Sequence, residues 1–340
     1  QALCQSLSKY GFIKVSDIVS ADIVILNTCS VRAQAEQKAF SWLGRAQELK
    51  KQKRDLKIAV IGCMAQRLGE KISKRFKSVD LVIGAKNLHN AAQQILSLKK
   101  EQSEVPVLNN TPPASVRPAV EPVVIMRGCD NYCSYCVVPY VRGHEVSVDC
   151  ETIVTQCEKA SQNGAQEIML LGQNVNSYNY KGVNFASLLR KIAKIQSVKN
   201  LTFMTSHPKD LSGELISAMA EEPKIKKYIH LPMQSACDKI LELMNRKYTY
   251  AHYKSLIDKI REKIPQINIT TDIIVGFPQE TGEDFNQTLQ AVKDIGFNAL
   301  FAFKYSPRPN TKAADMQDDV PLAEKKRRHN LILEEARRGK

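Results

Sequence analysis

Apolar strand patterns alternate with helical patterns along most of this chain, and this alternation constrains its fold more than any other feature. Strand candidates in the first 99 residues lie at 22–26, 57–61 and 81–83. Helical patterns follow them at about 30–50, 65–76 and 87–99. Strands that alternate with helices are typical of a parallel sheet covered by helices. The sequence therefore predicts an N-terminal open parallel α/β sheet domain over residues 1–99.

The alternation resumes after residues 100–121, a proline-rich stretch with little apolar periodicity that predicts a linker. Strand candidates then lie at 123–127, 167–171, 200–205, 228–231, 268–275 and 299–304, with helical patterns between them and a basic helix at 321–340. Polar or glycine-rich loops follow every strand at the same end. This arrangement favours a partial (β/α)6 barrel over residues 122–340, with the chemistry on those loops.

Composition and charge narrow the class of protein. The 340 residues are 43% hydrophobic and 25% charged, which excludes a disordered chain or a small disulfide scaffold. No apolar run approaches the ~18 residues of a membrane-spanning helix. The chain holds 49 Lys and Arg against 35 Asp and Glu, a net charge of +14 that favours a polyanionic partner such as nucleic acid. The opening at Gln1, within a helical pattern, leads us to expect a fragment of a longer protein.

The strongest chemical signal is the triplet Cys129-x-x-x-Cys133-x-x-Cys136, directly after the first barrel strand. Three thiolates this close can hold three irons of a [4Fe–4S] cluster and leave the fourth iron open. Four thiolates would occupy all four irons, as in clusters that only transfer electrons. An open metal position lets a site bind and act on a substrate. The alternative is a structural zinc knuckle, but no second cysteine pair or His partner lies nearby.

Two more cysteines occupy equivalent places in the N-terminal sheet. Cys29 follows the strand at 22–26, and Cys63 follows the strand at 57–61. Strand-to-helix turns of an open α/β sheet converge on one crevice, and a helix N-terminus favours thiolate over thiol. These positions suggest a second cluster, with two unrelated buried thiols as the alternative. Cys150, Cys157 and Cys237 match no ligand position and are interpreted as small buried hydrophobic residues.

The strings NTCSVR, GCMAQ, MRGCDNYCSYCVVPYVRG, LLGQNVNSY, TSHPKDLS, HLPMQS, TTDIIVGFP and YSPRP together resemble the radical S-adenosylmethionine (SAM) tRNA methylthiotransferases. The resemblance implies that the triplet holds a [4Fe–4S] cluster whose open iron binds SAM, with Tyr135 at the motif's aromatic position. It also implies an auxiliary [4Fe–4S] cluster held by Cys29, Cys63 and a third cysteine that would precede Gln1. Cys4 does not align with that third ligand. We expect this fragment to lack the C-terminal RNA-binding β-barrel that the family carries.

By the same resemblance, the chain is a transferase that methylthiolates carbon 2 of N(6)-dimethylallyladenosine at position 37, next to the tRNA anticodon. The implied partners are the tRNA anticodon loop and an electron donor such as flavodoxin or ferredoxin, with no membrane. We expect a cytoplasmic monomer. Two alternatives within the enzyme class are the threonylcarbamoyl-adenosine branch and the ribosomal-protein branch. A non-enzyme alternative is a metal-stabilised RNA-binding protein.

Several polar residues fall just past the barrel strands, where a barrel builds its pocket. The candidates for SAM contact are Gln173, Asn174, Ser206, Gln234 and Asp272, in addition to Tyr135. Loop capping explains each of them equally well when it is taken singly. His207 is interpreted as a turn residue or RNA contact rather than a base, and no residue is assigned as catalytic.

Two features of charge and turn chemistry complete the expectations. Basic runs at 45–57, 71–77 and 325–328 would attract phosphate without regard to base sequence, or else form solvated helix faces. Gln279 stands where the family usually has glycine, and a side chain there could alter a tight turn.

Overall fold

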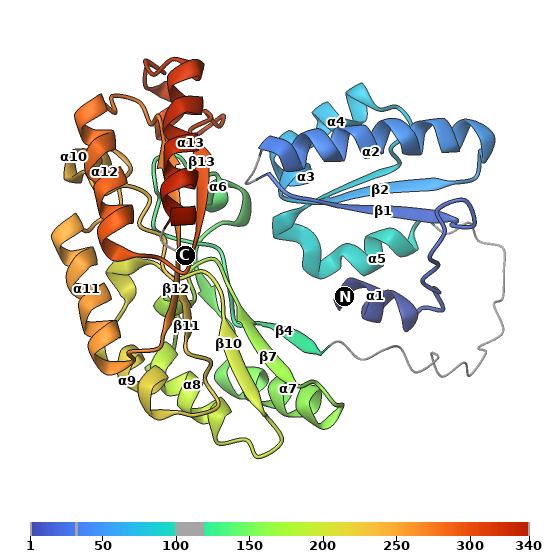
Figure 1. The fold of residues 1–340 in the computed structure, drawn as a ribbon. Helices are drawn as coiled ribbons and strands as arrows, with labels where there is room; N and C mark the ends of the chain where they lie inside the picture. Colours follow the sequence, from blue (N-terminus) through green and yellow to red (C-terminus); the bar gives the residue numbers. More distant parts are fainter. Residues whose placement is uncertain (1, 31–32, 99–118, 339–340) are drawn as a thin grey trace. The chain divides into compact units, whose positions relative to one another are not determined.

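The computed structural model describes residues 2–30, 33–98 and 119–338 (Figure 1). The chain separates into two compact units, one of residues 1–115 with 140–143 and one of residues 116–139 with 144–340. Residues 100–118 of the predicted linker at 100–121 lie outside the described residues. Residues 120–121 already belong to the first strand of the second unit.

The first unit is an open parallel sheet with helices on both faces. Its strands are β1 (Ile23–Thr28), β2 (Lys57–Gly62) and β3 (Leu81–Gly84), in the order β1-β2-β3. Alternate residues of β2 enter two separate cores: Ile58 and Val60 face one, and Ala59 and Ile61 face the other. This double burial is why the strand is almost entirely apolar, as a parallel strand covered on both sides must be.

The helices divide between those two faces. Helices α2 (Ala33–Gln52), α3 (Cys63–Leu68) and α4 (Glu70–Arg75) cover one face, and α1 (Ala2–Ser8) and α5 (Ala91–Leu96) cover the other, as Figure 1 shows. A 3₁₀ turn, η1 (Ala85–Asn90), leads into α5. The single helix expected at 65–76 is wrong, because Gly69, with φ +42°, breaks it into α3 and α4.

The second unit contains six parallel barrel strands in two three-stranded sheets. The strands are β4 (Val120–Val124), β7 (Glu167–Leu171), β10 (Asn200–Phe203), β11 (Tyr228–His230), β12 (Asn268–Val275) and β13 (Ala299–Lys304). The pairing orders are β10-β7-β4 and β11-β12-β13, and a parallel bridge from Leu201 to Ile225 joins β10 to the segment before β11. Strand order thus follows chain order, which confirms the partial barrel and leaves β4 and β13 at its edges.

Short elements and helices complete this unit. The strand expected at 123–127 ends earlier, because the chain leaves the barrel at Ile125 to form β5 (Met126–Arg127), which pairs antiparallel with β6 (Val146–Ser147). A hairpin of β8 (Asn179–Tyr180) and β9 (Val183–Asn184) was not predicted. The helices are α7 (Cys150–Gln162), α8 (Phe185–Ala193), α9 (Gly213–Glu221), α10 (Asp238–Leu243), α11 (Tyr250–Lys263), α12 (Gly282–Ile295) and α13 (Leu322–Arg338). The short helix α6 (Val138–Arg142) is divided between the units, because residues 140–143 belong to the first. Three 3₁₀ turns lie at η2 (Val175–Ser177), η3 (Pro208–Asp210) and η4 (Lys312–Asp315).

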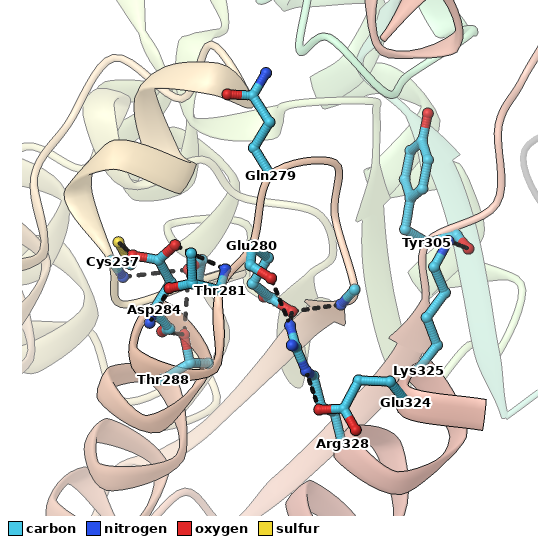
Figure 2. Close-up of polar contacts among 12 residues, drawn as sticks. Cys237, Gln279, Glu280, Thr281, Asp284, Thr288, Tyr305, Glu324, Lys325 and Arg328 are labelled. Atoms are coloured by element: carbon cyan, nitrogen blue, oxygen red, sulfur yellow. Dashed lines mark hydrogen bonds and ion pairs between the residues drawn. The ribbon is translucent and has the colours of Figure 1, made fainter. Parts of the chain in front are cut away.

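The main barrel helices begin at side chains that cap them. Asp149, Asn184, Ser212 and Thr249 each accept a hydrogen bond from a backbone N–H in the first turn that follows. Helix α12 begins with a capping box in which Thr281 and Asp284 satisfy each other's backbone N–H groups (Figure 2). Such caps satisfy donors that a helix cannot pair internally, so these short polar residues set where each helix begins.

Buried charges attach α13 to the turn that follows β12 (Figure 2). Arg328 Nη1 donates to Glu280 Oε2 at 2.6 Å, and its Nε donates to Glu324 Oε1 at 2.8 Å. Glu280 Oε2 also accepts from the Gly276 N–H at 2.6 Å. Lys325 pairs with Asp318. The expectation that 325–328 is a solvated or phosphate-attracting run is therefore wrong for Lys325 and Arg328, whose side chains are buried in ion pairs.

The same turn contains the glycine replacement noted in the sequence. Gln279 adopts φ +66°, in the left-handed region that favours glycine, so the backbone keeps the glycine-type turn at a cost of ~1 kcal/mol or more. The Gln279 N–H donates to Asp319 Oδ1 at 2.9 Å, a contact that holds the turn in place. The residue at position 279 therefore adds backbone strain to this turn.

Candidate iron–sulfur and cofactor sites

The cysteine triplet lies on one loop after β5, and its thiols are near enough to influence each other electrostatically. Cys133 is buried, whereas Cys129 and Cys136 are partly exposed, and none of the three is in a disulfide. The Cys136 N–H donates to the Cys133 carbonyl at 3.0 Å and closes a tight turn. Burial raises the pKa of Cys136 to about 12, and the charge of Cys133 adds to that rise. Burial and Cys133 also raise the pKa of Cys129. A positively charged metal centre would compensate thiolates at such a site.

The end of α10 and the residues just after it support this loop through hydrogen bonds. The Ser134 N–H donates to the Met244 carbonyl at 3.0 Å, and Ser134 Oγ donates to the Leu243 carbonyl at 2.7 Å. Asn245 Nδ2 donates to the carbonyls of Asn131 and Tyr132, at 3.2 and 2.8 Å. These contacts between protein groups hold the backbone of the cysteine loop in place without a ligand. Sequence reasoning did not identify the 243–246 segment.

The donor set fits an iron–sulfur cube by its chemistry. The triplet offers three thiols, and none of them is in a disulfide. Each cysteine of a cube binds a different iron, so three cysteines can hold three irons and leave the fourth open. Among the described residues, no three His, Cys, Asp or Glu side chains converge to hold a single metal ion.

Buried polar atoms without a protein partner gather just past the barrel strands. They are Gln173 Oε1 and Asn174 Oδ1 after β7, Ser206 Oγ and His207 Nε2 after β10, and Gln234 Oε1 after β11. Glu280 Oε1, after β12, also lacks a partner, but the other oxygen of that carboxylate pairs with Arg328. Buried polar groups are nearly always hydrogen-bonded, and a polar ligand would satisfy the first five atoms. Four of the five residues are predicted SAM contacts. The amino, carboxylate and ribose groups of SAM match the chemistry of these atoms.

The remaining predicted SAM residues, Asp272 and Tyr135, already have protein contacts. Asp272 Oδ2 lies 3.4 Å from His230 Nε2, and His230 Nδ1 lies 2.9 Å from Thr270 Oγ1. The Tyr135 ring packs against an apolar cluster that includes Met244 and Phe277. Neither geometry identifies a ligand contact, and SAM binding by these two residues stays a prediction. His230 was not predicted, because a histidine inside a strand carries no sequence signal of its partner.

His207 is a neutral hydrogen-bonding group among these residues. Burial, with smaller effects from Arg246 and Lys209, lowers the pKa of His207 to about 2. Its Nδ1 accepts from the Lys209 N–H at 3.3 Å, which leaves Nε2 as the protonated nitrogen. A neutral imidazole with so low a pKa is a weak base, which agrees with its interpretation as a turn residue.

Cys29 and Cys63 follow neighbouring strands at matching positions in the first unit. Thr28 of β1 pairs in register with Gly62 of β2, so the next residue along each strand is a cysteine. Thr28 Oγ1 donates to the Ile61 carbonyl at 2.6 Å and ties the strand ends together. Cys63 is the buried first residue of α3, whereas Cys29 is exposed and precedes α2. The register places both residues at one edge of the sheet, as a shared cluster requires.

A largely buried polar cluster next to Cys29 was not predicted. Ser30 is buried and donates to Glu36. Arg67 Nε donates to Ser30 Oγ at 2.8 Å, and Arg67 Nη2 pairs with Glu36 at 2.7 Å. These bonds connect the turn after β1 with α2 and with α3, the helix that begins at Cys63. They therefore fix the position of the turn that contains Cys29 relative to the turn that contains Cys63.

Gly62 allows the two cysteine turns to approach, and its replacement should loosen the first unit. Its φ is +101°, and a Cβ at this position would lie 2.4 Å from the Thr28 carbonyl oxygen. We expect Gly62→Ala to lower the free energy of unfolding of this unit by about 1–3 kcal/mol, the cost of forcing a side chain into such backbone. Denaturant titration measures this change.

Gly44→Ala is the matched control, because Gly44 lies within α2 and a Cβ there would meet nothing within 4 Å. Alanine is the better helix former, so this control should raise stability by about 0.5–1 kcal/mol. Equal effects of the two substitutions would contradict the close-approach argument.

The barrel with a three-cysteine loop after its first strand defines a radical SAM protein. The sequence profile of the radical SAM superfamily matches residues 123–292, and that of the uncharacterized protein family UPF0004 matches residues 1–84. A solved radical S-adenosylmethionine methyltransferase, TsrM from Kitasatospora setae, superposes with a TM-score of 0.65 at 15% identity, over 91% of this chain and 66% of that one. This likeness shows the shared fold.

Relatives with curated names narrow the assignment from the radical SAM superfamily to one family within it. The tRNA-2-methylthio-N(6)-dimethylallyladenosine synthase of Endomicrobium trichonymphae is 58% identical over 98% of this chain and 79% of its own length. The protein of that name from Thermodesulfovibrio yellowstonii is 48% identical over 92% of this chain and 74% of its own length. This chain belongs to the tRNA-2-methylthio-N(6)-dimethylallyladenosine synthase family. The SAM and [4Fe–4S] cofactors expected from the sequence are those of this family.

Proposed function

We propose that this chain is a radical SAM tRNA methylthiotransferase that replaces the carbon 2 hydrogen of N(6)-dimethylallyladenosine with a methylthio group. The observation that carries the proposal is the conjunction of the cysteine loop with five unpartnered polar atoms at the same end of the barrel. The 58% identity to a curated relative of that name supports the choice of substrate.

We assign Cys129, Cys133 and Cys136 to the SAM-binding cluster, and Cys29 and Cys63 to the auxiliary cluster. When bound, the SAM cluster and SAM supply an electron and a 5′-deoxyadenosyl radical that activates the C–H bond. The protein's own task is to position and to shield. Gln173, Asn174, Ser206 and Gln234 would orient SAM through their unpartnered oxygens, and the neutral His207 would donate from Nε2.

The macromolecular partner in this proposal is the anticodon loop of tRNA, whose unstacked bases can enter a pocket. The net charge of +14 supports an anionic partner. The basic residues at 45–57 and 71–77 support the same inference, since most of their side chains are exposed or half-exposed. Part of this charge is already paired with carboxylates, at Lys50, Lys51, Lys53, Lys57 and Lys74. An electron donor of the flavodoxin or ferredoxin type, a monomeric state and a cytoplasmic location also belong to the proposal. No helix in the described ranges is long and apolar enough to cross a membrane.

The experiment is mass spectrometry of tRNA nucleosides from a strain in which the gene encoding this chain is deleted. We expect loss of 2-methylthio-N(6)-dimethylallyladenosine and accumulation of N(6)-dimethylallyladenosine, both reversed by the restored gene. Loss of a methylthiolated threonylcarbamoyl-adenosine would instead support that branch of the family. Unchanged tRNA with a colourless, zinc-containing purified chain would support the RNA-binding alternative and overturn the proposal.

A further inference from the structure

Arg246 places a buried positive charge against one of the predicted cluster ligands. Only 4% of the residue is exposed. Its Nη1 lies 3.4 Å from Cys133 Sγ and 3.4 Å from Tyr135 Oη. Its Nη2 donates to the Pro232 carbonyl at 3.1 Å, and its Nε donates to Tyr248 Oη at 3.2 Å. The guanidinium is therefore fixed on several sides, with one N–H directed at the ligand sulfur.

This cation has no carboxylate partner among the described residues. The side-chain groups within hydrogen-bonding distance of it are Tyr135 Oη, Tyr248 Oη and Cys133 Sγ. Tyrosine hydroxyls are neutral near pH 7, whereas a cysteine bound to iron is a thiolate. Arg328 offers the contrast, since its equally buried guanidinium pairs with Glu280 and Glu324. A buried, unpaired charge is costly, so the compensating negative charge is expected at the Cys133 sulfur.

The backbone around Arg246 is held in a conformation that side chains rarely adopt. Asn245 has φ +56° and Lys247 has φ +61°, so left-handed residues flank the arginine on both sides. Asn245 also holds the cysteine loop through the carbonyls of Asn131 and Tyr132. The same short segment thus fixes the loop and presents the guanidinium to it. Strain of this kind persists only where the surrounding structure enforces it.

We propose that Arg246 is a positioning residue that raises the reduction potential of the cluster bound by the cysteine triplet. The inference rests on the proposed function, because that function places a cluster there. Reduction by a low-potential one-electron donor adds one negative charge to the cluster and breaks no bond. A fixed positive charge and an N–H bond to a ligand sulfur both stabilise the reduced form, since hydrogen bonds to sulfur and local charge set such potentials.

The test is a redox titration, followed by electron paramagnetic resonance, of the anaerobically reconstituted chain without SAM. We expect Arg246→Gln to shift the midpoint to more negative potential by at least 59 mV, a tenfold change in the one-electron equilibrium constant. Arg246→Lys keeps the charge and loses the fork of N–H groups, so its shift should have the same sign and be smaller. Arg190→Gln removes a charge that pairs with Glu221 and Glu222 on the surface, and should leave the midpoint unchanged.

An Arg246→Gln midpoint equal to that of the wild type, or more positive, overturns the proposal. If Arg246→Gln fails to load iron, Arg246→Lys decides: a loaded cluster with the wild-type midpoint overturns the proposal, and a negative shift supports it. Cleavage of SAM by the wild-type chain is measured separately with excess chemical reductant. Failure of that cleavage counts against the proposed function, whereas the midpoints count only for or against Arg246.

Discussion

Cys133→Ala is expected to abolish formation of 5′-deoxyadenosine from SAM, whereas Cys29→Ala is expected to leave it intact. Cys133 is the most buried of the triplet, and it is the one that Arg246 contacts. Two remaining thiolates would hold a cube at two corners only, so about four irons per chain should be lost. Cys29 belongs to the other unit and to the proposed auxiliary cluster. Its loss should stop methylthiolation without affecting SAM cleavage.

Chromatographic measurement of 5′-deoxyadenosine, together with iron analysis, checks both variants. Cys157→Ala is the matched control, because Cys157 is also a buried thiol, within α7, and has no proposed ligand role. It should keep the iron content and the cleavage of SAM. Cleavage of SAM by Cys133→Ala at the wild-type rate would show that the intact cysteine triplet is not needed for this reaction. Loss of cleavage in Cys29→Ala would show that the two sites are not separable.

Arg328→Met is expected to destabilise the barrel unit by about 3–5 kcal/mol, the usual cost of removing one partner of a buried ion pair. Arg328 pairs with Glu280 at 2.6 Å, and side-chain exposures are 6% and 1%. Without Arg328, the Glu280 carboxylate would stay buried with only the Gly276 N–H as a donor. The raised pKa of Glu280, caused by burial, shows that this carboxylate already bears a desolvation cost.

Denaturant unfolding followed by circular dichroism measures this effect. The double variant Glu280→Met with Arg328→Met should be less destabilised than Arg328→Met alone, since it leaves no uncompensated charge. Lys326→Met, two residues away on the exposed face of α13, should change stability by less than about 0.5 kcal/mol. A similar effect of Arg328→Met and Lys326→Met would mean that the pair does not anchor α13.

Strand positions and the cysteine motif could be predicted from the sequence because both are local signals. β7, β12 and β13 were predicted at their observed bounds, since apolar runs flanked by polar loops define them. The breaks at Ile125 and Gly69 were missed. The first depends on the pairing of Met126 and Arg127 with Ser147 and Val146, far along the chain, and the second depends on one left-handed residue. The helix α10 was missed because its six residues are too short for periodicity.

The residues of the candidate sites also divide into those with a local sequence signal and those without one. Cysteines and polar loop residues could be selected by type and by their place after a strand. Arg246, His230 and the cluster of Ser30, Glu36 and Arg67 depend on contacts between distant segments, and no spacing rule finds such contacts. The run at 325–328 shows the converse error, because lysine and arginine side chains were taken for surface charge where tertiary ion pairs had buried two of them.

The support that the residues after α10 give the cysteine loop has a consequence for biosynthesis. Hydrogen bonds to that loop join positions 109 to 114 apart in the chain. During translation the ribosome must therefore release the 243–246 segment before the iron-binding loop reaches its final shape. Cofactor insertion into the nascent chain would act on an unsupported loop. The loop in its supported form is therefore available for metal loading only after the chain has been synthesised through residue 246.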